Sequence, residues 1–312
     1  MDIACSSITW GPLRRAGDGP YAGLVGLERI LDEIRAGGYS HAVASIVGRR
    51  AAPGGAAADA GPLATPQGQL DLLARHELRA APGSIGGLPL GDPEQIETCV
   101  ESARAAARYT RGLGLDAVYL MPESAPSRRE SPGHYPVGAR PDAMPPERVA
   151  ATCAALDRMG AACRTEGVWL CLHNHAGMFW ETGAEFEEVI AGTDPARVAL
   201  GPDVGHMVWG GTDPAPWFRR HMDRVRSIHI KDVDGTVLRR VREERLSYGA
   251  ASDAGIWTEI GSGAVDWPAL FAIWRQAGYG GAVVVESDRT RLPTPAESVA
   301  RSRAYLRDSL GA

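Results

Sequence analysis

Short apolar runs alternate with amphipathic segments along the whole chain. Eight of these runs are bounded by turn residues and have the composition of buried strands. The expected strands are Ile3–Thr9, Ser40–Ile46, Leu78–Ala81, Ala117–Met121, Val168–Asn174, Val198–Asp203, Arg226–Lys231 and Ala282–Glu286. The segments between them have the pattern of amphipathic helices, so the sequence predicts a repeated strand–helix unit.

Start signals mark several of these helices. Asp accepts a hydrogen bond from a free backbone N–H, and Pro at the first helical position lacks only an N–H that would be unpaired anyway. Asp92-Pro93 and Pro145-Pro146-Glu147 mark helix starts, and Thr193-Asp194-Pro195, Asp213-Pro214 and Asp266-Trp267-Pro268 are further turn or cap signals. Eight units favour an α/β fold of the closed (β/α)8 TIM-barrel type. No glycine-rich dinucleotide-binding motif follows the first strand, which disfavours a Rossmann domain.

Three connections are too long and too rich in Gly, Pro and charge to be simple turns. They are Arg49–Leu63, Pro122–Pro145 and Asp232–Glu259. All three follow expected strands, so in a barrel they would lie on the face that carries active sites. No linker divides the chain, and we predict a single TIM-barrel domain over residues 1–312.

Length and charge restrict the class of function. The 312 residues fit one barrel with insertions, and a hydrophobic fraction of 44% can fill a large core. The net charge of −5, without a basic stripe, argues against nucleic-acid binding. No signal-peptide pattern opens the sequence, and no apolar run approaches the roughly 18 residues that span a membrane. We therefore expect a cytoplasmic protein without a membrane partner. The five cysteines have no CxxC spacing and are expected to be reduced and mostly buried.

One basic residue differs from all the others. Of the 33 basic residues, Lys231 is the only lysine. Arg is a wide fork that is always charged, whereas Lys is a compact charge that can lose its proton when buried. Lys231 is therefore a candidate for a position whose function an arginine could not perform. A lysine retained by chance would give the same composition.

Polar groups stand at the carboxyl ends of the last four expected strands. Ionisable groups are expensive inside a core, and strands as apolar as these are buried. Four successive strand ends converge on one point only if the sheet closes into a barrel. They then form a set of two imidazoles and two carboxylates with open positions, which predicts a site for one divalent metal ion. The predicted ligands are His173, Asp203, His229 and Glu286.

The ligand types restrict the metal. Imidazoles and carboxylates together favour Mn²⁺ or Co²⁺, with Zn²⁺ or Fe²⁺ as alternatives, over Mg²⁺ or Ca²⁺. Such an ion polarises a ketone oxygen and lowers the barrier to losing an α-proton. Each ligand also has an ordinary explanation: a strand histidine is often a core residue, Asp203 fits a helix cap, and Glu286 fits a pair with Arg289. Their shared placement at strand ends favours the metal site.

The other histidines and four tryptophans carry less information. The histidines without this placement are expected to be surface or packing residues; they are His41, His76, His134 and His221. Four tryptophans lie near expected strand ends, where lining a pocket and packing a core are equally good explanations; they are Trp10, Trp180, Trp209 and Trp257.

Five segments resemble the sugar phosphate isomerase/epimerase superfamily, the xylose-isomerase-like TIM barrels, and within it the inosose dehydratases most closely. They are LCLHNHAG, LGPDVGHMVWGGTDP, SIHIKDVDGTVLRRVREERLSYG, GIWTEIGSGAVDWPAL and GYGGAVVVESD. Their order and spacing, over about residues 165–310, are specific for the superfamily. In the first half only SSITWGP, at the first strand, is similar.

The resemblance implies roles for individual residues. It makes Asp203, His229 and Glu286 metal ligands, and it places His206 and Lys231 beside the substrate. The expected reaction is therefore a lyase reaction, a dehydration or another β-elimination, on a keto-inositol or keto-sugar through a metal-stabilised enolate.

Two positions depart from the pattern of the family. Most of the superfamily carries Glu at the position of His173, and epimerases use that Glu with the strand-eight Glu as an acid/base pair. A metal-bound imidazole does not easily shuttle a proton, and dehydratase-like members also carry His there, so His173 favours elimination. Inosose dehydratases also carry a Glu near the end of strand two, where this chain reads His-Ala-Val-Ala-Ser45. The missing carboxylate argues against inosose itself as the substrate.

Candidate catalytic residues stand close to the predicted ligands. The expected base is His206 or Lys231, and the expected acid is Glu259 or His175. Trp10 is an expected substrate contact together with His206 and Lys231.

Alternatives from other classes stay open. An isomerase or epimerase acting on a ketose or hydroxy-keto acid needs the same metal and the same enolate, and only His173 argues against it. No sequence feature forbids a non-catalytic sugar-binding barrel. A DNA-repair endonuclease is disfavoured, because Ser45-Ile46, Ala81-Pro82 and Met121-Pro122 offer no further ligands apart from Glu123. The expected partner is a small polyhydroxylated keto substrate. The resemblance is also compatible with a homo-oligomer.

Overall fold

Short parallel strands form the centre of the molecule. The computed structural model describes residues 1–11, 26–44, 61–135 and 140–312. The central strands are β1 Asp2–Ser6, β2 His41–Val43, β3 Arg79–Ala80, β4 Ser84–Ile85, β5 Ala117–Leu120, β6 Trp169–Leu172, β7 Val198–Leu200, β8 Ser227–Ile230 and β11 Ala282–Val285.

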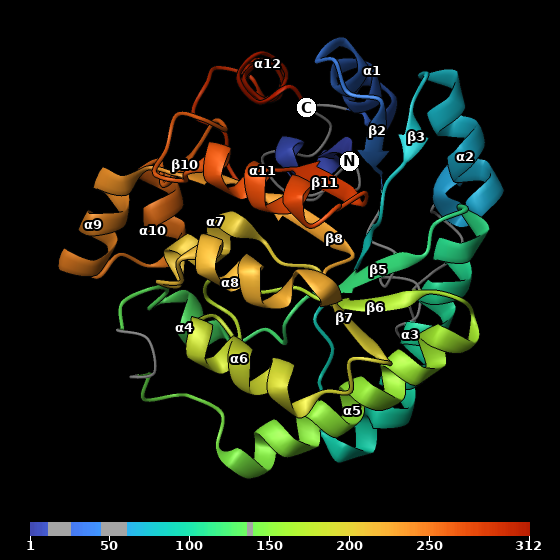
Figure 1. Cartoon of the computed structure of the whole chain (residues 1–312), viewed down its shortest axis with the longest axis vertical. Helices are drawn as coiled ribbons and strands as arrows, with labels where there is room; N and C mark the ends of the chain where they lie inside the picture. Colours follow the sequence, from blue (N-terminus) through green and yellow to red (C-terminus); the bar gives the residue numbers. More distant parts are fainter. Residues whose placement is uncertain (12–25, 45–60, 136–139) are drawn as a thin grey trace.

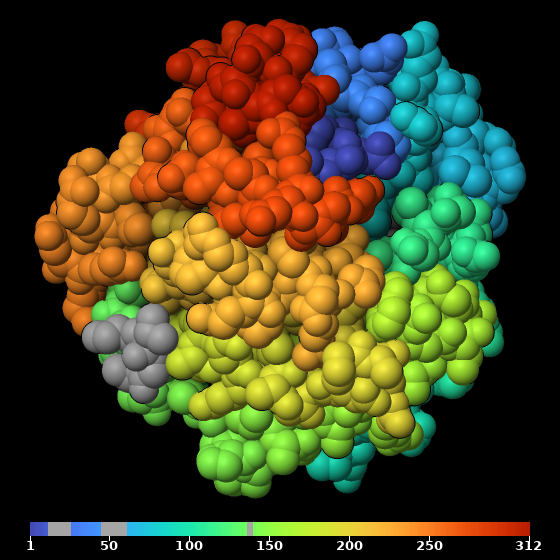
Figure 2. All heavy atoms as spheres, viewed as in Figure 1, coloured from blue at the N-terminus to red at the C-terminus, as the bar shows by residue number. Residues whose placement is uncertain are grey.

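These strands close into a ring. One run of parallel strands has the order β3-β2-β1-β11-β8, and a second has the order β4-β5-β6-β7. Parallel bridges between Leu200 and Val225 and between Asp203 and His229 join β7 to β8. At the other side of the ring the outer strands of the two runs are β3 and β4, which follow each other closely along the chain. The first and last units therefore lie side by side, blue against red in the space-filling view (Figure 2). The predicted α/β barrel is confirmed.

The third expected strand is interrupted. Leu78–Ala81 was expected as one strand, but β3 covers only Arg79–Ala80, and the separate β4 pairs with β5. Pro82 lies between them and has no N–H for the ladder, which explains the break. Of the second expected strand, Ser45–Ile46 lies outside the described residues.

Helices surround the ring (Figure 1). The α-helices are α1 Leu27–Ala36, α2 Pro66–Arg75, α3 Ile96–Gly112, α4 Pro126–Arg129, α5 Pro146–Thr165, α6 Gly183–Gly192, α7 Val204–Trp209, α8 Pro214–His221, α9 Gly235–Glu243, α10 Tyr248–Asp253, α11 Trp267–Gln276 and α12 Pro295–Leu310. The short 3-10 helices are η1 Ser7–Trp10, η4 Gly61–Ala64, η5 Pro93–Gln95 and η6 Met222–Arg224. Asp92, Asp213 and Asp266 act as N-caps directly before Pro-containing first turns, as expected.

The expected loop Asp232–Glu259 is a folded insertion. It contains α9, α10 and an antiparallel hairpin of β9 Asp232–Val233 and β10 Trp257–Thr258. Its apolar side chains form a second hydrophobic cluster with residues from the barrel. The members include Ala176, Trp209, Val237, Val241, Tyr248 and Trp257. The insertion lies at the left edge of Figure 1 and packs over the barrel beside α7.

The connection after β5 is also tied down. It contains α4, and Arg128 in this helix is fully buried and paired with Glu185. Arg140 pairs with Glu181, which also accepts hydrogen bonds from the backbone of Gly133 and Gly177. Of the three expected long loops, residues 136–139 of this one and 49–60 of the first lie outside the described residues.

Two further expectations concern the whole chain. All five cysteines are free and buried, as expected. Among the described residues, none of the helices combines the length and the apolar character needed to cross a membrane. That the chain is a single domain stays a prediction.

Candidate metal and substrate site

The four predicted ligands come together at the carboxyl ends of β6, β7, β8 and β11. His173, Asp203 and His229 are buried, the last two fully inaccessible to solvent, and the Glu286 side chain is 9% exposed. One donor atom each from His173, Asp203 and Glu286 lies within 4.8 Å of the others. The rings of His229 and His173 are 5.0 Å apart and perpendicular. The structure thus brings His173, Asp203 and Glu286 together as one possible metal-binding group and places the ring of His229 beside His173. The assignment of all four residues to a metal stays a prediction.

Local interactions fix Asp203 at this point. Asp203 is the N-cap of α7, and its Oδ1 accepts a hydrogen bond from the backbone N–H of His206 at 2.9 Å. The Asn174 side chain holds the Asp203 backbone by two hydrogen bonds, of 2.8 and 3.1 Å. The helix-cap explanation of Asp203 is therefore correct, but it uses only one of the two carboxylate oxygens.

His173 is oriented as a metal-binding histidine would be. Its Nδ1 lies 3.0 Å from the Gly201 carbonyl oxygen, which accepts a hydrogen bond and so fixes the tautomer with the proton on Nδ1. The lone pair of Nε2 is then free. Burial and the neighbouring His229 and Lys231 lower the pKa of His173 well below its ordinary value, so the ring is neutral at pH 7.

His229 gives the strongest test of whether a metal fits. Both of its ring nitrogens are buried and have no hydrogen-bond partner in the described structure. Burial lowers the pKa of His229 to about 4, so it is neutral at pH 7. An unpaired buried nitrogen is costly in a protein core, and a bound metal ion would satisfy one of the two. The neutral imidazoles and the carboxylates therefore fit a metal ion.

Lys231 lies between the carboxylates. Its Nζ is 3.2 Å from Asp203 Oδ2, forms an ion pair with Glu286, and lies 3.7 Å from Asp288 Oδ1. Burial alone would lower the pKa of Lys231, but these three carboxylates raise it, so the amine stays charged. Three carboxylates around one ammonium leave an excess of buried negative charge. A divalent cation would offset that excess.

Burial acts on the carboxylates in different ways. It raises the pKa of Asp203 to about 7, an effect that Lys231 opposes and Glu286 reinforces. For Glu286 burial is outweighed by Lys231 and His229, and the pKa is lowered. Glu286 is thus the more firmly ionised of the two predicted carboxylate ligands.

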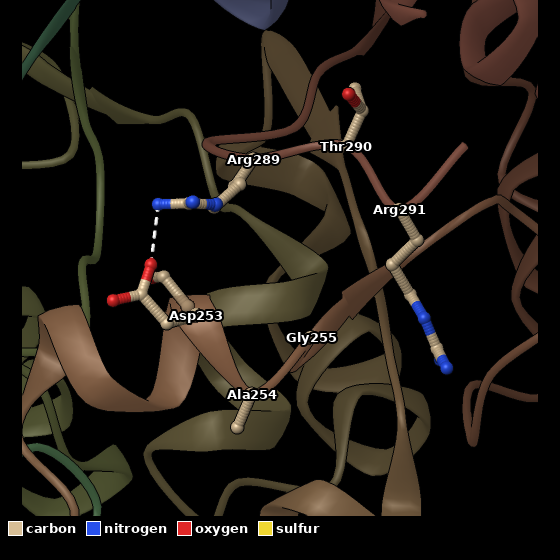
Figure 3. A pocket seen from close by; sticks show the side chains of 7 residues that line it. Asp253, Ala254, Gly255, Arg289, Thr290 and Arg291 are labelled. Carbon is tan, nitrogen blue, oxygen red and sulfur yellow. Dashed lines mark ion pairs between the residues drawn. The ribbon is translucent and has the colours of Figure 1, made fainter. Parts of the chain in front are cut away.

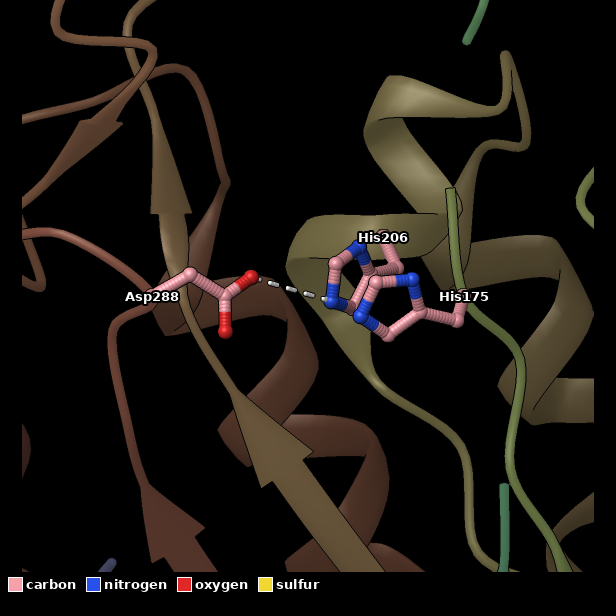
Figure 4. Close-up of side chains that lie close together, drawn as sticks. All are labelled: His175, His206 and Asp288. Carbon is pink, nitrogen blue, oxygen red and sulfur yellow. Dashed lines mark ion pairs between the residues drawn. The ribbon is translucent and has the colours of Figure 1, made fainter. Parts of the chain in front are cut away.

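A second group of side chains lies on the other side of Lys231. Figure 4 shows the rings of His206 and His175 facing Asp288, and one donor atom of each of the three lies within 4.8 Å of the others. His206 Nε2 is 3.0 Å from Lys231 Nζ and 3.7 Å from Asp288 Oδ2. Asp288 was part of a motif but was not predicted as a site residue. Its position two residues after Glu286, on the same side of an extended segment, was the available signal.

The tautomers of the two histidines follow from their partners. His206 faces two donors, the Lys231 ammonium at Nε2 and the Ala176 N–H at Nδ1, which is 3.3 Å away. The charge-assisted contact is shorter and stronger, so we assign the lone pair to Nε2. His175 donates from Nδ1 to the Ala176 carbonyl at 2.7 Å, and burial lowers its pKa to about 4. The free nitrogen of His175 is therefore an acceptor at pH 7.

Two predicted site residues contact other parts of the molecule. The carboxylate of Glu259 accepts a hydrogen bond from Ser298 of α12, at 2.7 Å. Trp10 donates from its indole to Glu33 of α1. Neither residue has a described contact with the cluster around Lys231. The structure therefore gives no support to Glu259 as the acid or to Trp10 as a substrate contact.

The histidines expected to be surface or packing residues are all satisfied elsewhere. His76 pairs with Asp32, His221 with Glu187, and His134 bonds to the Leu246 carbonyl. His41 lies beside Ser40 at the start of β2. Unlike His229, each has a partner for a ring nitrogen.

Comparison with known proteins identifies the family. A family model for xylose isomerase-like TIM barrels matches residues 69–309. The chain belongs to this family. The match also confirms the predicted superfamily.

Within the xylose isomerase-like family, inosose dehydratases are among the similar proteins. One from Geobacillus thermodenitrificans (strain NG80-2) is 34% identical over 157 residues, which are 50% of this chain and 53% of the relative. Another from Geobacillus kaustophilus (strain HTA426) is 29% identical over 240 residues, 74% of this chain and 78% of the relative. The first match thus spans about half the length of that relative. These matches confirm the predicted similarity to inosose dehydratases.

Several solved structures have the same fold as this chain. A sugar phosphate isomerase/epimerase from Parabacteroides distasonis ATCC 8503 superposes with a TM-score of 0.68 at 17% identity, over 98% of this chain and 93% of that chain. The IOLI protein with a bound zinc atom superposes with a TM-score of 0.65 at 14% identity, over 100% and 98%. At such identities the likeness establishes the fold alone.

Proposed function

We propose that this protein is a divalent-metal-dependent lyase that removes water, or another β-leaving group, from a small cyclic keto-polyol. The observation that carries the proposal is the pairing of a neutral His206 with a charged Lys231, 3.0 Å apart, beside the predicted ligand set. The similarity to inosose dehydratases supports the same class of reaction.

The predicted ligands would be His173, Asp203, His229 and Glu286. When bound, a divalent ion would polarise the substrate carbonyl and acidify the α-carbon. The imidazoles and carboxylates of this set suit Mn²⁺, Co²⁺, Zn²⁺ or Fe²⁺. The zinc atom in the IOLI protein, which has the same fold, is compatible with this range.

His206 is the proposed base. Burial and the neighbouring His175 and Lys231 lower its pKa well below the ordinary value, so the ring is neutral and one of its nitrogens is unprotonated. The lone pair on Nε2 faces the Lys231 ammonium, which lies between Asp203 and Glu286 of the ligand set. His206 is therefore suited to remove the α-proton of a substrate bound there.

Lys231 is the proposed acid. Its ammonium keeps its proton because of Asp203, Asp288 and Glu286. In the reaction an α-C–H bond and a β-C–O bond break, and a C=C bond forms. His206 takes the α-proton, and Lys231 gives a proton to the departing hydroxyl, which leaves as water. The 3.0 Å contact then allows the proton on His206 to return to Lys231, which restores both groups.

The nature of His173 favours elimination over epimerisation. Epimerisation by proton transfer on two faces needs a second proton-transferring group opposite the first. The Nδ1 of His173 is committed to the Gly201 carbonyl, and its Nε2 faces the ligand set. It is thus not free to act as that second group.

A product assay tests the proposal. The purified protein, loaded with Mn²⁺, would be incubated with keto-inositols, 3-keto sugars and ketoses. The masses of the products would be measured by mass spectrometry. We expect a product lighter by one water or one leaving group, and loss of that product in His206→Asn and Lys231→Met. Products of unchanged mass would show an isomerase or epimerase instead. Binding without turnover would show a sugar-binding barrel.

A further inference from the structure

One aromatic residue of the insertion reaches the centre of the site. Tyr248 is the first residue of α10, and Ser247 caps this helix by accepting a hydrogen bond from Ala250 N. Although the insertion lies on the outside of the barrel, the Tyr248 side chain is buried. Its hydroxyl donates a short hydrogen bond to Asp288 Oδ2. No sequence pattern marked this residue, because the contact joins segments 40 residues apart.

The partner of this hydroxyl borders the proposed acid and base. Asp288 Oδ1 is 3.7 Å from Lys231 Nζ, and its Oδ2 is 3.7 Å from His206 Nε2. Both separations exceed a hydrogen bond but are within the range of an ion pair. The Tyr248 hydroxyl occupies one acceptor position of Oδ2, so it holds the carboxylate back from a direct bond to either group.

The ring of Tyr248 belongs to a stack that ends at His206. It lies 4.8 Å from Trp209 with an interplanar angle of 13°, and 5.7 Å from His175 with an angle of 21°. His175 in turn lies 3.7 Å from His206. The guanidinium of Arg129 lies 4.3 Å from the Tyr248 ring centre. Tyr248 thus contacts the cluster through both its hydroxyl and its ring.

Two outer contacts fix the same part of the insertion. Arg289 pairs with Asp253 at a cavity of about 280 Å³ between α10 and the segment after β11, and Arg291 pairs with Asp234, the N-cap of α9. Figure 3 shows Arg289 reaching across to Asp253 at this seam. The Tyr248–Asp288 bond is the innermost contact between the same two segments.

We propose that Tyr248 is a positioning residue, which holds Asp288 and His175 so that Lys231 and His206 keep the geometry needed for proton transfer. Helix α10 therefore completes the site, although it belongs to an insertion and not to the barrel. This inference rests on the proposed lyase function. It goes beyond that function because it assigns a role to a residue that contacts neither the predicted ligands nor the proposed acid and base directly.

A conservative substitution tests the role of the hydroxyl. Tyr248→Phe keeps the ring and removes one hydrogen bond to a charged group. We expect kcat to fall by about 10- to 100-fold, with KM changed by less than about threefold. The matched control is Tyr39→Phe, which removes a buried hydroxyl bonded to the Val299 carbonyl, far from the cluster in sequence. It should keep both constants while reducing Tm to a similar extent.

A double-mutant cycle distinguishes positioning from general packing. In an Asp288→Asn background, Tyr248→Phe should lower kcat by less than about threefold further, because the partner of the hydroxyl is already changed. Should Tyr248→Phe not fold, Asp288→Asn alone tests the same bond from its other end and should lower kcat by 10-fold or more.

The outcomes separate the two proposals. If the wild-type protein turns over a keto-polyol and Tyr248→Phe has the same kcat and KM as Tyr39→Phe, the role of Tyr248 is overturned. The lyase function then still stands. A rise in KM with unchanged kcat also overturns the positioning role, since that result indicates that Tyr248 only contributes to substrate binding. Wild-type protein without turnover of any keto-polyol overturns the lyase function, and the inference with it.

Discussion

The two halves of the barrel differ in what stands at the ends of their strands. Strands β6, β7, β8 and β11 lead into buried ionisable groups, among them His173, Asp203 and Glu286. The residues directly after β1, β2, β3 and β5 are not ionisable; they are Ser7, Ala44, Ala81 and Met121. Glu123, shortly after β5, pairs with Arg148 instead of joining the cluster. Parallel strands lead to the same face of the barrel in both halves, so the chemistry depends on which residues follow the strand ends.

This difference has an energetic side. Buried charges lower stability unless they are paired, and apolar strand ends carry no such penalty. The first half therefore supplies packing, while the second carries groups that core packing alone does not explain. The unpartnered nitrogens of His229 are the clearest example. Four predictions test this difference between the two halves of the barrel, in order from the largest expected effect to the smallest.

Removing one ligand from the polar half should abolish metal binding. We expect His229→Ala to weaken Mn²⁺ binding by more than about 100-fold, since even an outer partner of a ligand is worth roughly 10- to 100-fold. Calorimetric titration and elemental analysis measure this. The matched variant in the other half is His41→Ala, which removes a buried histidine from β2 and should bind Mn²⁺ normally. Equal affinity in the two variants would contradict a metal site at His229.

Removing the lysine should make the protein depend on metal for stability. Lys231→Met leaves Asp203, Glu286 and Asp288 without their buried cation, which we expect to destabilise the metal-free protein by about 3–5 kcal/mol. Because Mn²⁺ would then supply the missing positive charge, its stabilising effect should be larger in the variant than in the wild type. Urea unfolding with and without Mn²⁺ measures both. An equal effect of Mn²⁺ on the two proteins would show that Lys231 and the metal do not share these carboxylates.

Loosening the segment after β5 should affect dynamics more than metal binding. Arg140→Met leaves the buried Glu181 without its ion-pair partner, while its bonds to the Gly133 and Gly177 amides remain. We expect these two amides to exchange hydrogen at least about tenfold faster, since a weakened anchor opens locally. Exchange read by NMR is the measurement. Arg158→Met, which breaks an exposed pair with Glu97, is the control. Unchanged exchange at Gly133 would show that the anchor is not needed.

Removing a helix cap should have the same small effect in both halves. Thr182 caps α6 by accepting a hydrogen bond from Glu185 N, and Thr65 caps α2 in the same way from Gly68 N. Each Thr→Ala change should destabilise by about 1 kcal/mol and lower Tm by roughly 2–4 °C. Metal content should stay unchanged in both. Loss of metal in Thr182→Ala alone would mean that ordinary stability and the site are not separable in the polar half.

The barrel could be predicted because its signals are local. Strand ends follow from short apolar runs, and helix starts from caps such as Asp213 and Asp266. The prediction of secondary structure was wrong where many charged residues concealed the spacing of a helix. Val237, Leu238 and Val241 have helical spacing within the insertion, but the charged residues around them led to a loop being expected. The proline at position 82, which interrupts the third strand, can be read from the sequence. That Ser84–Ile85 forms a new strand depends on its pairing with β5, which the sequence pattern does not contain.

The site could be predicted only as far as strand ends define it. His173, Asp203, His229 and Glu286 meet because parallel strands end on one face. The direction of a side chain outside the strands depends on tertiary packing, which the sequence pattern does not contain. Glu259 bonds to Ser298 of α12, and Tyr248 reaches Asp288, although both belong to the same insertion.

The single lysine also determines how the protein can be labelled. Because Lys231 is buried among carboxylates, an amine-reactive ester finds no accessible lysine side chain in this sequence. The lysine would become reactive only when the packing around it opens. The rate of labelling at Lys231 would therefore report how often the cluster opens to solvent.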